Sequence, residues 1–411
     1  MWIHWLASAR AATLTVGAGQ TYATIGDALA DAIDGDVIEV HAGTYREELV
    51  VDVPVSIIGV GDPVIEATAT AEEVVDVLAA ALIEGVTIDG RGLARGVHGG
   101  SGDLTLRGVT VRNGEAQDGG GLMFYGPRRL VVADCTFVDN HAWSEGGGVY
   151  AKEHGLVAVS DSTFERNTAG DGGAIFAEEL RSLLIHDAVF DHNEASSFGG
   201  ALALHLNMYA TREDHELIGN RFCANLAFDG GAVEVVRRHP HHPGGVRVEG
   251  NRFQENVAER HGGAIDGYSH TSWGVPRPWT LFLVGNTFVA NEAITEGGAH
   301  VALSQYARLQ AYDDLFAYAV GDAGLFAEDV GGLDNDWFFD NDQRDFGGAI
   351  TAGSFGPSTG FGSDPLLTNY SPDGDCTNDD TSPAPGSPLI DAGTPLLLDP
   401  DGSPSDIGTA W

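Results

Sequence analysis

This sequence is poor in cysteine, in basic residues and in long apolar runs. Three cysteines among 411 residues are too few for a disulfide framework, although a pair between Cys223 and Cys376 stays open. Lys and Arg number 21 against 60 Asp and Glu, and the net charge of −39 argues against nucleic acid or an anionic membrane as a partner. No apolar run approaches the roughly 18 residues of a membrane-spanning helix, so membrane insertion is not expected.

Glycine, in contrast, is abundant, with 57 residues, and much of it belongs to a repeated signature. A glycine pair followed by a small residue and usually an aliphatic one alternates with Phe-x-x-Asn. From each Phe to the next pair is 8 or 9 residues, and from a pair to the next Phe is 18 in the regular copies. A period near 27 at fixed phase indicates a solenoid. The Phe and Asn positions are Phe137/Asn140, Phe164/Asn167, Phe190/Asn193, Phe222/Asn225, Phe253/Asn256, Phe288/Asn291 and Phe338/Asn341.

Within each repeat, the pattern before the Phe predicts strands and no helix. Apolar residues stand seven and five positions before it, as Leu130 and Val132 do, and a spacing of two places both side chains on one face. An Asp or Gly then turns the chain. A unit of this length with short strands closes only as a parallel β-coil, so we expect an all-β fold, a parallel β-helix with Phe stacked inside and Asn ladders in the turns.

The ends of the chain read as caps on one continuous domain. Thr24 and Asp27 form a capping-box pattern that opens a short helix through Ile33, which we expect to cover the first coil. Residues 1–11 end in an Ala-x-Ala pattern and are interpreted as the remnant of a leader. Residues 12–117 are assigned to the N-terminal cap and first coils, 118–350 to the regular repeats, and 351–411 to a Pro- and Asp-rich tail and cap. Two capped ends favour a monomer.

These repeats resemble the right-handed parallel β-helix proteins of the pectin-lyase-like superfamily. Within it, the GGA[ILV] and FxxN signatures of residues 118–350 resemble the repeats of chlamydial polymorphic outer membrane proteins. The tail from Ser387 to Gly393, with Asp406 to Gly408, resembles the endings of variable-anchor bacterial surface proteins. The resemblance implies an extracellular or cell-surface protein with a binding role. The resemblance also implies an alternative, because many other proteins of this superfamily are polysaccharide lyases and hydrolases.

Three consecutive repeats carry insertions of 5, 5 and 8 residues at the same phase, after the glycine pairs at 199, 230 and 262. Loops at one phase of a solenoid stack on one side, which is usually the binding side. The segment 205–281 gathers aromatic and basic residues, which stack on sugar rings and pair with acidic groups. We therefore expect a polysaccharide, a cell-surface glycan or a surface protein to bind at Tyr209, Arg212, Arg237, Arg238, Tyr268, Trp273, Arg277 and Trp279.

The sequence favours recognition without catalysis, as in an adhesin, because no paired-Asp motif of the β-helix hydrolases is present. The enzyme alternative is a polysaccharide lyase or hydrolase acting at the same loops. A base would then be sought among His215, Arg237 and His270. The structural alternative is a surface or filament protein whose coils stack end to end.

No cofactor is required by these expectations, but calcium is a candidate ligand. Asp399, Asp401 and Asp406 have the spacing of oxygen ligands in calcium loops. The residue before each glycine pair is also often acidic, which gives a broken carboxylate row along the rod. Solvated acidic turns are the alternative interpretation in both places. The row comprises Asp118, Glu145, Asp171, Asp229 and Glu296.

Overall fold

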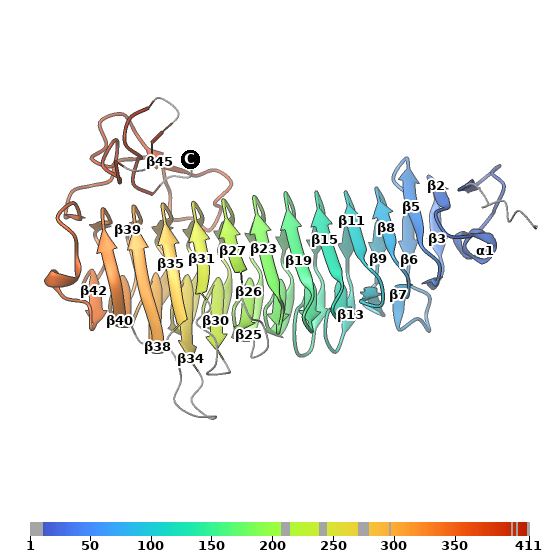
Figure 1. Cartoon of the computed structure of the whole chain (residues 1–411), viewed down its shortest axis with the longest axis horizontal. Coiled ribbons are helices and arrows are strands. Elements are labelled where there is room, and N and C mark those ends of the chain that lie inside the picture. Colours follow the sequence, from blue (N-terminus) through green and yellow to red (C-terminus); the bar gives the residue numbers. More distant parts are fainter. Residues whose placement is uncertain are drawn as a thin grey trace, which may run out of the picture.

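The computed structural model describes residues 11–206, 214–237, 245–269, 279–295, 297–395, 398–399 and 402–408. They form a rod, a right-handed parallel β-helix with a short helix at one end (Figure 1). Its strands lie in three parallel sheets of 23, 13 and 7 strands, named sheets A, B and C below, and a two-stranded antiparallel sheet lies in the tail. This confirms the predicted fold class. Within the described residues, no helix has the length and apolarity to cross a membrane.

Each regular coil contributes two strands to sheet A and one strand each to sheets B and C. The strand that follows a glycine pair belongs to the first arm of sheet A, and the next strand belongs to its second arm. The first arm holds β14 (Leu122–Tyr125), β18 (Val149–Lys152), β22 (Ile175–Glu178), β26 (Leu202–Leu206), β30 (Val233–Arg237) and β34 (Ile265–Ser269). The second arm holds β15 (Arg129–Ala133), β19 (Leu156–Ser160), β23 (Ser182–His186), β27 (Asp214–Ile218), β31 (Gly245–Glu249) and β35 (Trp279–Val284).

Sheets B and C complete these coils. Sheet B carries the Phe residues and holds β16 (Thr136–Val138), β20 (Thr163–Glu165), β24 (Val189–Asp191), β28 (Arg221–Cys223), β32 (Arg252–Gln254) and β36 (Thr287–Val289). Sheet C precedes the glycine pairs and holds β13 (Glu115–Ala116), β17 (His141–Ala142), β21 (Thr168–Asp171), β25 (Glu194–Phe198), β29 (Leu226–Asp229), β33 (Val257–His261) and β37 (Glu292–Ala293).

The first and last coils are less regular. The first are built from β1 (Thr13–Val16), β2 (Val37–His41), β3 (Thr44–Arg46), β4 (Leu49–Val51), β5 (Val55–Val60), β6 (Val64–Glu66), β7 (Glu73–Val77), β8 (Ala81–Glu84), β9 (Thr87–Asp89), β10 (Arg95–Gly99), β11 (Leu104–Arg107) and β12 (Thr110–Arg112). The last are built from β38 (Val301–Tyr312), β39 (Leu315–Ala317), β40 (Leu325–Asp334), β41 (Trp337–Phe339), β42 (Phe346–Gly348) and β43 (Gly360–Phe361), and β44 (Leu367–Asn369) and β45 (Asp380–Pro383) pair in the tail.

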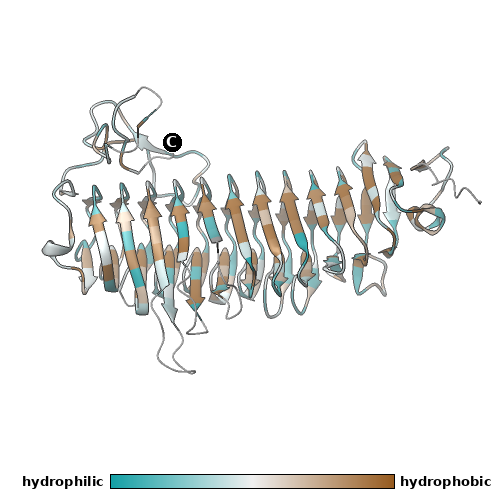
Figure 2. Cartoon of the chain, viewed as in Figure 1, coloured by the Kyte–Doolittle hydropathy of each residue, from teal (hydrophilic) through white to brown (hydrophobic). Residues whose placement is uncertain are grey.

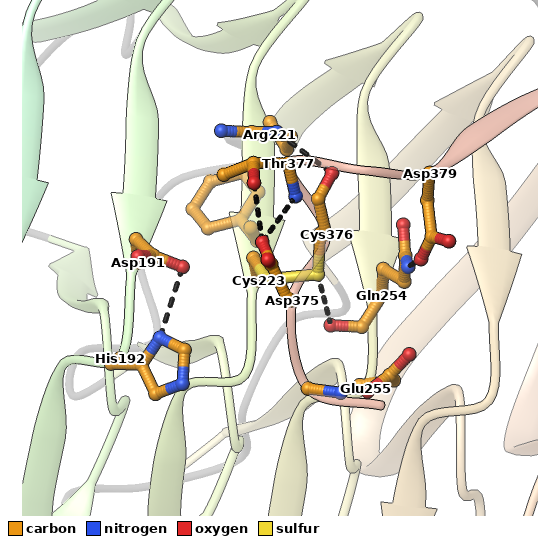
Figure 3. Close-up of a disulfide and its surroundings, with 12 residues drawn as sticks. Asp191, His192, Arg221, Cys223, Gln254, Glu255, Asp375, Cys376, Thr377 and Asp379 are labelled. Carbon is orange, nitrogen blue, oxygen red and sulfur yellow. Dashed lines mark hydrogen bonds and ion pairs between the residues drawn. A yellow bond between two sulfur atoms is a disulfide. The ribbon is translucent and has the colours of Figure 1, made fainter. Parts of the chain in front are cut away.

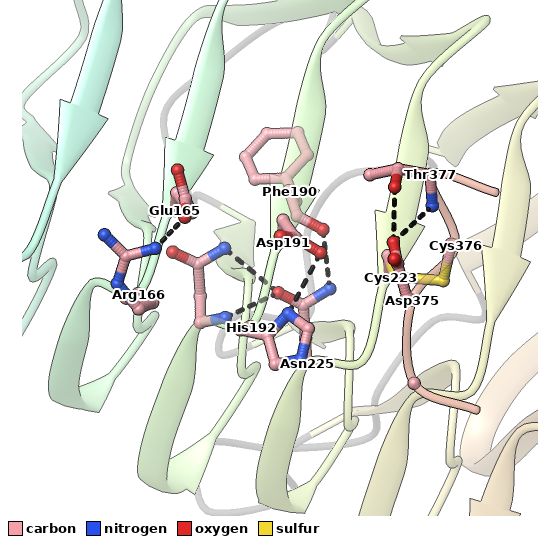
Figure 4. Close-up of polar contacts among 12 residues, drawn as sticks. Glu165, Arg166, Phe190, Asp191, His192, Cys223, Asn225, Asp375, Cys376 and Thr377 are labelled. Atoms are coloured by element: carbon pink, nitrogen blue, oxygen red, sulfur yellow. Dashed lines mark hydrogen bonds and ion pairs between the residues drawn. A yellow bond between two sulfur atoms is a disulfide. The ribbon is translucent and has the colours of Figure 1, made fainter.

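Two ladders run through the core as predicted. The rings from Phe137 to Phe316 stack with centroids 4.7 to 5.0 Å apart, which matches the spacing of parallel strands. In the turn that follows, each Asn from Asn167 to Asn291 accepts from the amide of the Asn before it and donates to a backbone carbonyl. Asn225, for example, accepts from Asn193 Nδ2 at 3.0 Å and donates to the Phe190 carbonyl at 3.0 Å (Figure 4). The buried turn is therefore fully hydrogen-bonded.

Two features of the core were not predicted from the sequence. Phe316 continues the Phe ladder although no Asn follows it at the expected spacing. A second amide ladder joins Asn220, Asn251 and Asn286 at the turn between sheets A and B, and ends on two buried acids, Asp314 and Asp336. The predicted turning residues adopt the left-handed conformation that Gly and Asp tolerate. In Figure 2, hydrophobic residues, coloured brown, recur in the strands along the whole rod.

The N-terminal cap is confirmed. The helix α1 (Ile25–Asp31) begins after Thr24, whose Oγ1 accepts from the amide of Asp27 at 3.1 Å. Its residues Ile25, Ala28 and Leu29 are buried against the first coil, so the helix covers the apolar end of the rod. It ends at Asp31, two residues earlier than expected.

At the other end, the cap and the tail have separate roles. Phe355 and Phe361 pack on Phe338 and close the last coil. The tail beyond them folds back along the outer face of sheet B rather than over the end, as the red segment in Figure 1 shows. A disulfide joins Cys376 of the tail to Cys223 of β28, and Arg221 donates to the Cys376 carbonyl at 2.9 Å (Figure 3). Cys135 stays a buried free thiol.

Candidate functional site

The glycine pairs create a sharp corner between sheet C and the first arm of sheet A. Gly230 and Gly262 have φ of 63° and 61°, a conformation that favours glycine. A Cβ atom on Gly230 would lie 2.5 Å from the Val233 carbonyl oxygen, so no larger residue fits the turn. At each corner, the residue before the glycine pair comes close to the first outward residue of the following strand. At the pair Gly230–Gly231 these two residues are Asp229 and Glu234.

Charged residues occupy the outer face of the first arm at two positions. Glu178 of β22 is paired in register with His205 of β26, and Glu234 of β30 is paired with Asp266 of β34. An outward face normally remains in water, yet here Glu234 is fully buried and Asp266 is 4% exposed. Burying a charge costs free energy unless the charge is paired. The acidic residues on this outer face therefore need partners, which residues exposed to water do not.

His205 links the two acids on either side of it. Its Nδ1 lies 3.8 Å from Glu178 Oε1, and its Nε2 lies 3.6 Å from Glu234 Oε2. Lys152 forms an ion pair with Glu178 from the neighbouring strand β18. The contact with His205 and the charge of Lys152 outweigh burial and lower the pKa of Glu178 to about 2. Glu178 therefore stays ionised.

Glu234 and Asp266 have the opposite tendency. Burial raises the pKa of Glu234, and His205 offsets only part of that effect. Burial also raises the pKa of Asp266 well above its ordinary value, and the charges of Glu234 and Asp229 raise it further. Neighbouring strands lie about 4.8 Å apart, so the two carboxyl groups influence each other's protonation. Burial and the neighbouring charges therefore both favour the protonated form of Asp266.

Asp229, on the other side of the corner, remains a carboxylate. Although it is 1% exposed, it accepts from Arg260 Nε at 3.0 Å and from the His261 backbone amide at 3.1 Å. Its carboxylate also lies 3.3 Å from His261 Nδ1. Burial works to raise the pKa of Asp229, but His261 and Arg260 prevail and lower it. Asp229 thereby orients the imidazole of His261.

These groups meet at a cavity of about 330 Å³ beside the corner. Asp266 and His261 both line it, together with Tyr268, Arg260, Ser304 and Gln305. On its rim, Gln305 and Tyr306 have φ of 47° and 69°, an unfavourable conformation for residues other than glycine. The amide of Gln305 is fixed by Glu328 Oε2 at 2.7 Å. The carboxyl group of Asp266, an imidazole held by a carboxylate and a guanidinium thus share one cavity.

Comparison with known proteins supports the assignment of the fold. Residues 161–178 match the Chlamydia polymorphic membrane protein repeat, and they cover β20 to β22, including Phe164, Asn167 and the following glycine pair. The repeat and the three parallel sheets occur together in this chain. The chain is a parallel β-helix that carries a sequence repeat of this kind. No curated protein sequence matches it.

Several solved structures are similar to this β-helix at low sequence identity. The pectate lyase Pel9A aligns with a TM-score of 0.43 and 12% identity, over 98% of this chain and 96% of its own. The pectin methylesterase from Aspergillus niger aligns with a TM-score of 0.30 and 14% identity, over 91% and 95%. The pectin methylesterase from carrot aligns with a TM-score of 0.29 and 13% identity, over 86% and 88%.

The predicted binding residues of the β-helix are only partly brought together. Tyr268 lines the cavity, and its role in ligand binding stays a prediction. Trp279 was expected on an exposed loop, but it lies fully buried in the hydrophobic core as the first residue of β35, so its ring is not available for stacking. Arg237 is 2% exposed at the end of β30. Tyr209, Arg212, Arg238, Trp273 and Arg277 lie outside the described residues.

Neither His215 nor Arg237, the two candidate bases among the described residues, lines this cavity. His215 is 2% exposed and occupies the inward row of β27, where its neighbours in register are Leu183 and Val246. It borders a separate cavity of about 350 Å³ with Arg247 and Phe282. His270 lies outside the described residues. An imidazole in a row of aliphatic side chains is a core residue by position.

In the tail, two of the three predicted calcium ligands lie together. Asp399 and Asp406 join Asp391 in a cluster whose carboxylate oxygens all lie within 4.8 Å of one another. The backbone amide of Asp391 donates to Asp406 Oδ1 at 2.8 Å. Asp401 lies outside the described residues. Calcium binding there stays a prediction. The described residues contain a second such group, formed by Glu73, Asp76 and His98.

The sequence reading passed over the four residues of the first arm, although a signal was present. Glu178, His205, Glu234 and Asp266 each follow a glycine pair within a few residues, inside strands that are otherwise apolar or small. Strand alternation places them outward, and the repeat aligns them on neighbouring coils. The longer insertions favour a site in the loops, and the prediction therefore placed the site there rather than on the strands that precede the loops. Burial of an outward face is not visible in sequence.

Proposed function

We propose that this β-helix is a secreted or cell-surface enzyme that hydrolyses a neutral glycan at the corner between sheet C and the first arm of sheet A. The observation that carries the proposal is that Asp266 and His261 line one cavity, where burial raises the pKa of Asp266 and the Asp229 carboxylate lies 3.3 Å from His261 Nδ1. Pairs of titratable groups with opposed environments are typical of acid–base catalysis. The disulfide is consistent with an oxidising compartment.

The proposed roles follow from these environments. Asp266 donates its proton to the leaving oxygen as the glycosidic bond breaks, and His261 accepts a proton from the attacking water. Asp229 is a positioning residue that orients His261 and stabilises its charged form. Glu234 is a positioning residue that helps Asp266 to keep its proton. The water's hydroxyl ends on the sugar, and its proton on His261 restores Asp266 through solvent.

The charge of the site selects against an acidic polysaccharide. Glu178 and Asp229 are ionised, Glu234 adds a further carboxyl group, and the chain as a whole carries a net charge of −39. These carboxylates would repel the carboxylate of a uronate. Arg260, which could attract it, already pairs with Asp229. A neutral glycan escapes the repulsion and is the substrate class that we infer.

Recognition without cleavage, through the loops within 205–281, is the second candidate function. The position of Tyr268 on the cavity wall favours it, because an aromatic ring beside polar groups suits a sugar whether or not a bond is broken. A protein of this kind would retain a glycan and release no product.

The test is incubation of the protein with neutral and acidic polysaccharides, followed by mass spectrometry of the soluble fraction. We expect oligosaccharides from a neutral polysaccharide, and a loss of about 10²–10⁴ in rate for Asp266→Asn, as for removal of a general acid. Asp340→Asn, an exposed carboxylate at the end of the rod, serves as the matched control and should be unchanged. Binding with no product from any polysaccharide would replace hydrolysis by the second candidate.

A further inference from the structure

One exposed aromatic residue lies on the same side of the rod as the corner, but several coils away from the cavity. Trp143 is 61% exposed, more than any other large hydrophobic side chain in the described part of the chain. It follows β17 directly and stands two residues before Glu145, the acid that precedes the next glycine pair. An exposed indole presents a flat apolar face and an N–H donor, which together suit stacking on a sugar ring.

The ring is held in a defined place. His141 packs edge-on against Trp143 with centroids 6.3 Å apart, and His141 Nδ1 lies 2.8 Å from Thr168 Oγ1 of the next coil. The backbone amide of Trp143 donates to the Ala116 carbonyl at 3.1 Å, which fixes its strand to the previous coil. A pre-positioned ring loses little conformational entropy when a ligand stacks on it.

A polar pocket of about 460 Å³ lies beside His141 and extends toward the N-terminal coils. Most of its carboxylates are neutralised by arginines. Arg46 pairs with Glu66, Arg112 with Asp89, and Arg166 with Asp139. The lining offers donors from Arg91 and Asn113 and acceptors from Glu115 and the paired acids. Mixed donors and acceptors with little unpaired positive charge suit a neutral ligand rich in hydroxyl groups.

Trp143 and the cavity of Asp266 are separated along the rod by a length that a polysaccharide can span. Four strand spacings of sheet C, from β17 through β21, β25 and β29 to β33, lie between the two coils, or about 19 Å at about 4.8 Å each. A sugar unit in an extended glycan is similar in length to one coil rise. A chain of about four or five units therefore reaches from the cavity to the indole.

We propose that Trp143, with the polar pocket beside His141, is a distal subsite that binds a neutral polysaccharide lying along the rod. The proposal rests on the proposed function for the position of the cleaved bond, and it adds the substrate's polymeric nature and orientation. The indole stacks on one sugar ring, and the pocket receives the hydroxyl groups of the units beyond it. Long chains gain this contact and short ones do not.

The test compares Trp143→Ala with the unaltered protein on cello-, manno- and xylo-oligosaccharides of increasing length. We expect kcat/KM to fall about three- to tenfold for chains long enough to reach Trp143, as for loss of one aromatic contact, and to stay unchanged for shorter chains. Trp143→Phe should recover part of the loss. Tyr312→Ala, which removes a 38%-exposed ring on the second arm, is the control and should change neither class.

A binding measurement separates this proposal from the proposed function. Affinity of the Asp266→Asn protein for the longest oligosaccharide should fall by the same factor when Trp143→Ala is added. Cleavage with equal loss on long and short chains, or with none, overturns the subsite and leaves hydrolysis intact. Binding that depends on Trp143, with no cleavage of any chain, overturns hydrolysis and keeps the subsite.

Discussion

The turn lined by Asn and the corner at the glycine pairs bury polar groups equally deeply, but they satisfy them differently. Asn225 and Glu234 are both fully buried. The Asn225 amide is matched on both sides by neighbouring coils. Neither carboxylate oxygen of Glu234 has a hydrogen bond among the described residues, and its nearest cationic partner, His205, is 3.6 Å away. Repetition of a neutral amide stabilises the rod, whereas the corner buries a carboxyl group whose charged form is disfavoured by burial.

The same contrast is repeated inside one ladder. The amides of Asn220, Asn251 and Asn286 are followed by the carboxyl groups of Asp314 and Asp336 on the last coils. Burial raises the pKa of Asp314 to about 8 and that of Asp336 well above its ordinary value. Where an acid replaces an amide, burial in the turn therefore favours the protonated form of the side chain.

The largest expected effect is on the regular side of this comparison. Phe222→Ala removes a fully buried ring stacked between Phe190 and Phe253, and we expect the free energy of unfolding to fall by about 3–5 kcal/mol. Denaturant unfolding followed by circular dichroism measures the loss. Phe228→Ala, which truncates a 39%-exposed ring on β29, is the control. Equal losses for both variants would show that the ladder is no more stabilising than the surface.

The sequence was sufficient to predict the regular side because each of its rules is local and repeated. Phe164 and Asn167 have fixed spacing from a glycine pair, and stacking of coils turns that spacing into ladders without further information. The helix over Ile25 and Leu29 follows from its capping residues and periodicity. Such features need no knowledge of which distant segments meet.

The corner was not predictable in the same way, because its properties depend on what covers it. The outward orientation of Glu234 follows from strand alternation. Its burial, and the pKa of Asp266, depend instead on residues of the neighbouring strands. Trp279 shows the reverse error, since an aromatic residue near an insertion entered the core. The fold of the tail onto sheet B depended on a disulfide between residues 153 positions apart. From the sequence alone, pairing of Cys223 with Cys376 was only one possibility.

The second expected effect concerns the acids at the end of the amide ladder. The unfolded chain loses these protons near pH 4 and the folded chain holds them to higher pH, so stability falls as pH rises from about 4 to about 8. Asp336→Asn removes one member of the pair, and we expect a higher midpoint of thermal unfolding at pH 8 with little change at pH 4. Asp340→Asn, exposed on the same coil, should show no such dependence. A uniform shift across pH would contradict the role of the proton.

The smallest expected change separates stability from function at the corner itself. Glu234→Gln keeps the shape of the side chain and removes its charge, so stability at neutral pH should rise slightly, because burial disfavours the ionised form. The same charge helps to raise the pKa of Asp266. Its removal should let Asp266 lose its proton at a lower pH, and the alkaline limb of the rate profile on a neutral glycan should move to lower pH. Glu216→Gln, on the second arm, should leave that limb in place. A gain in stability with an unmoved alkaline limb would make Glu234 a structural residue alone, and the corner would then differ from the ladder in composition but not in function.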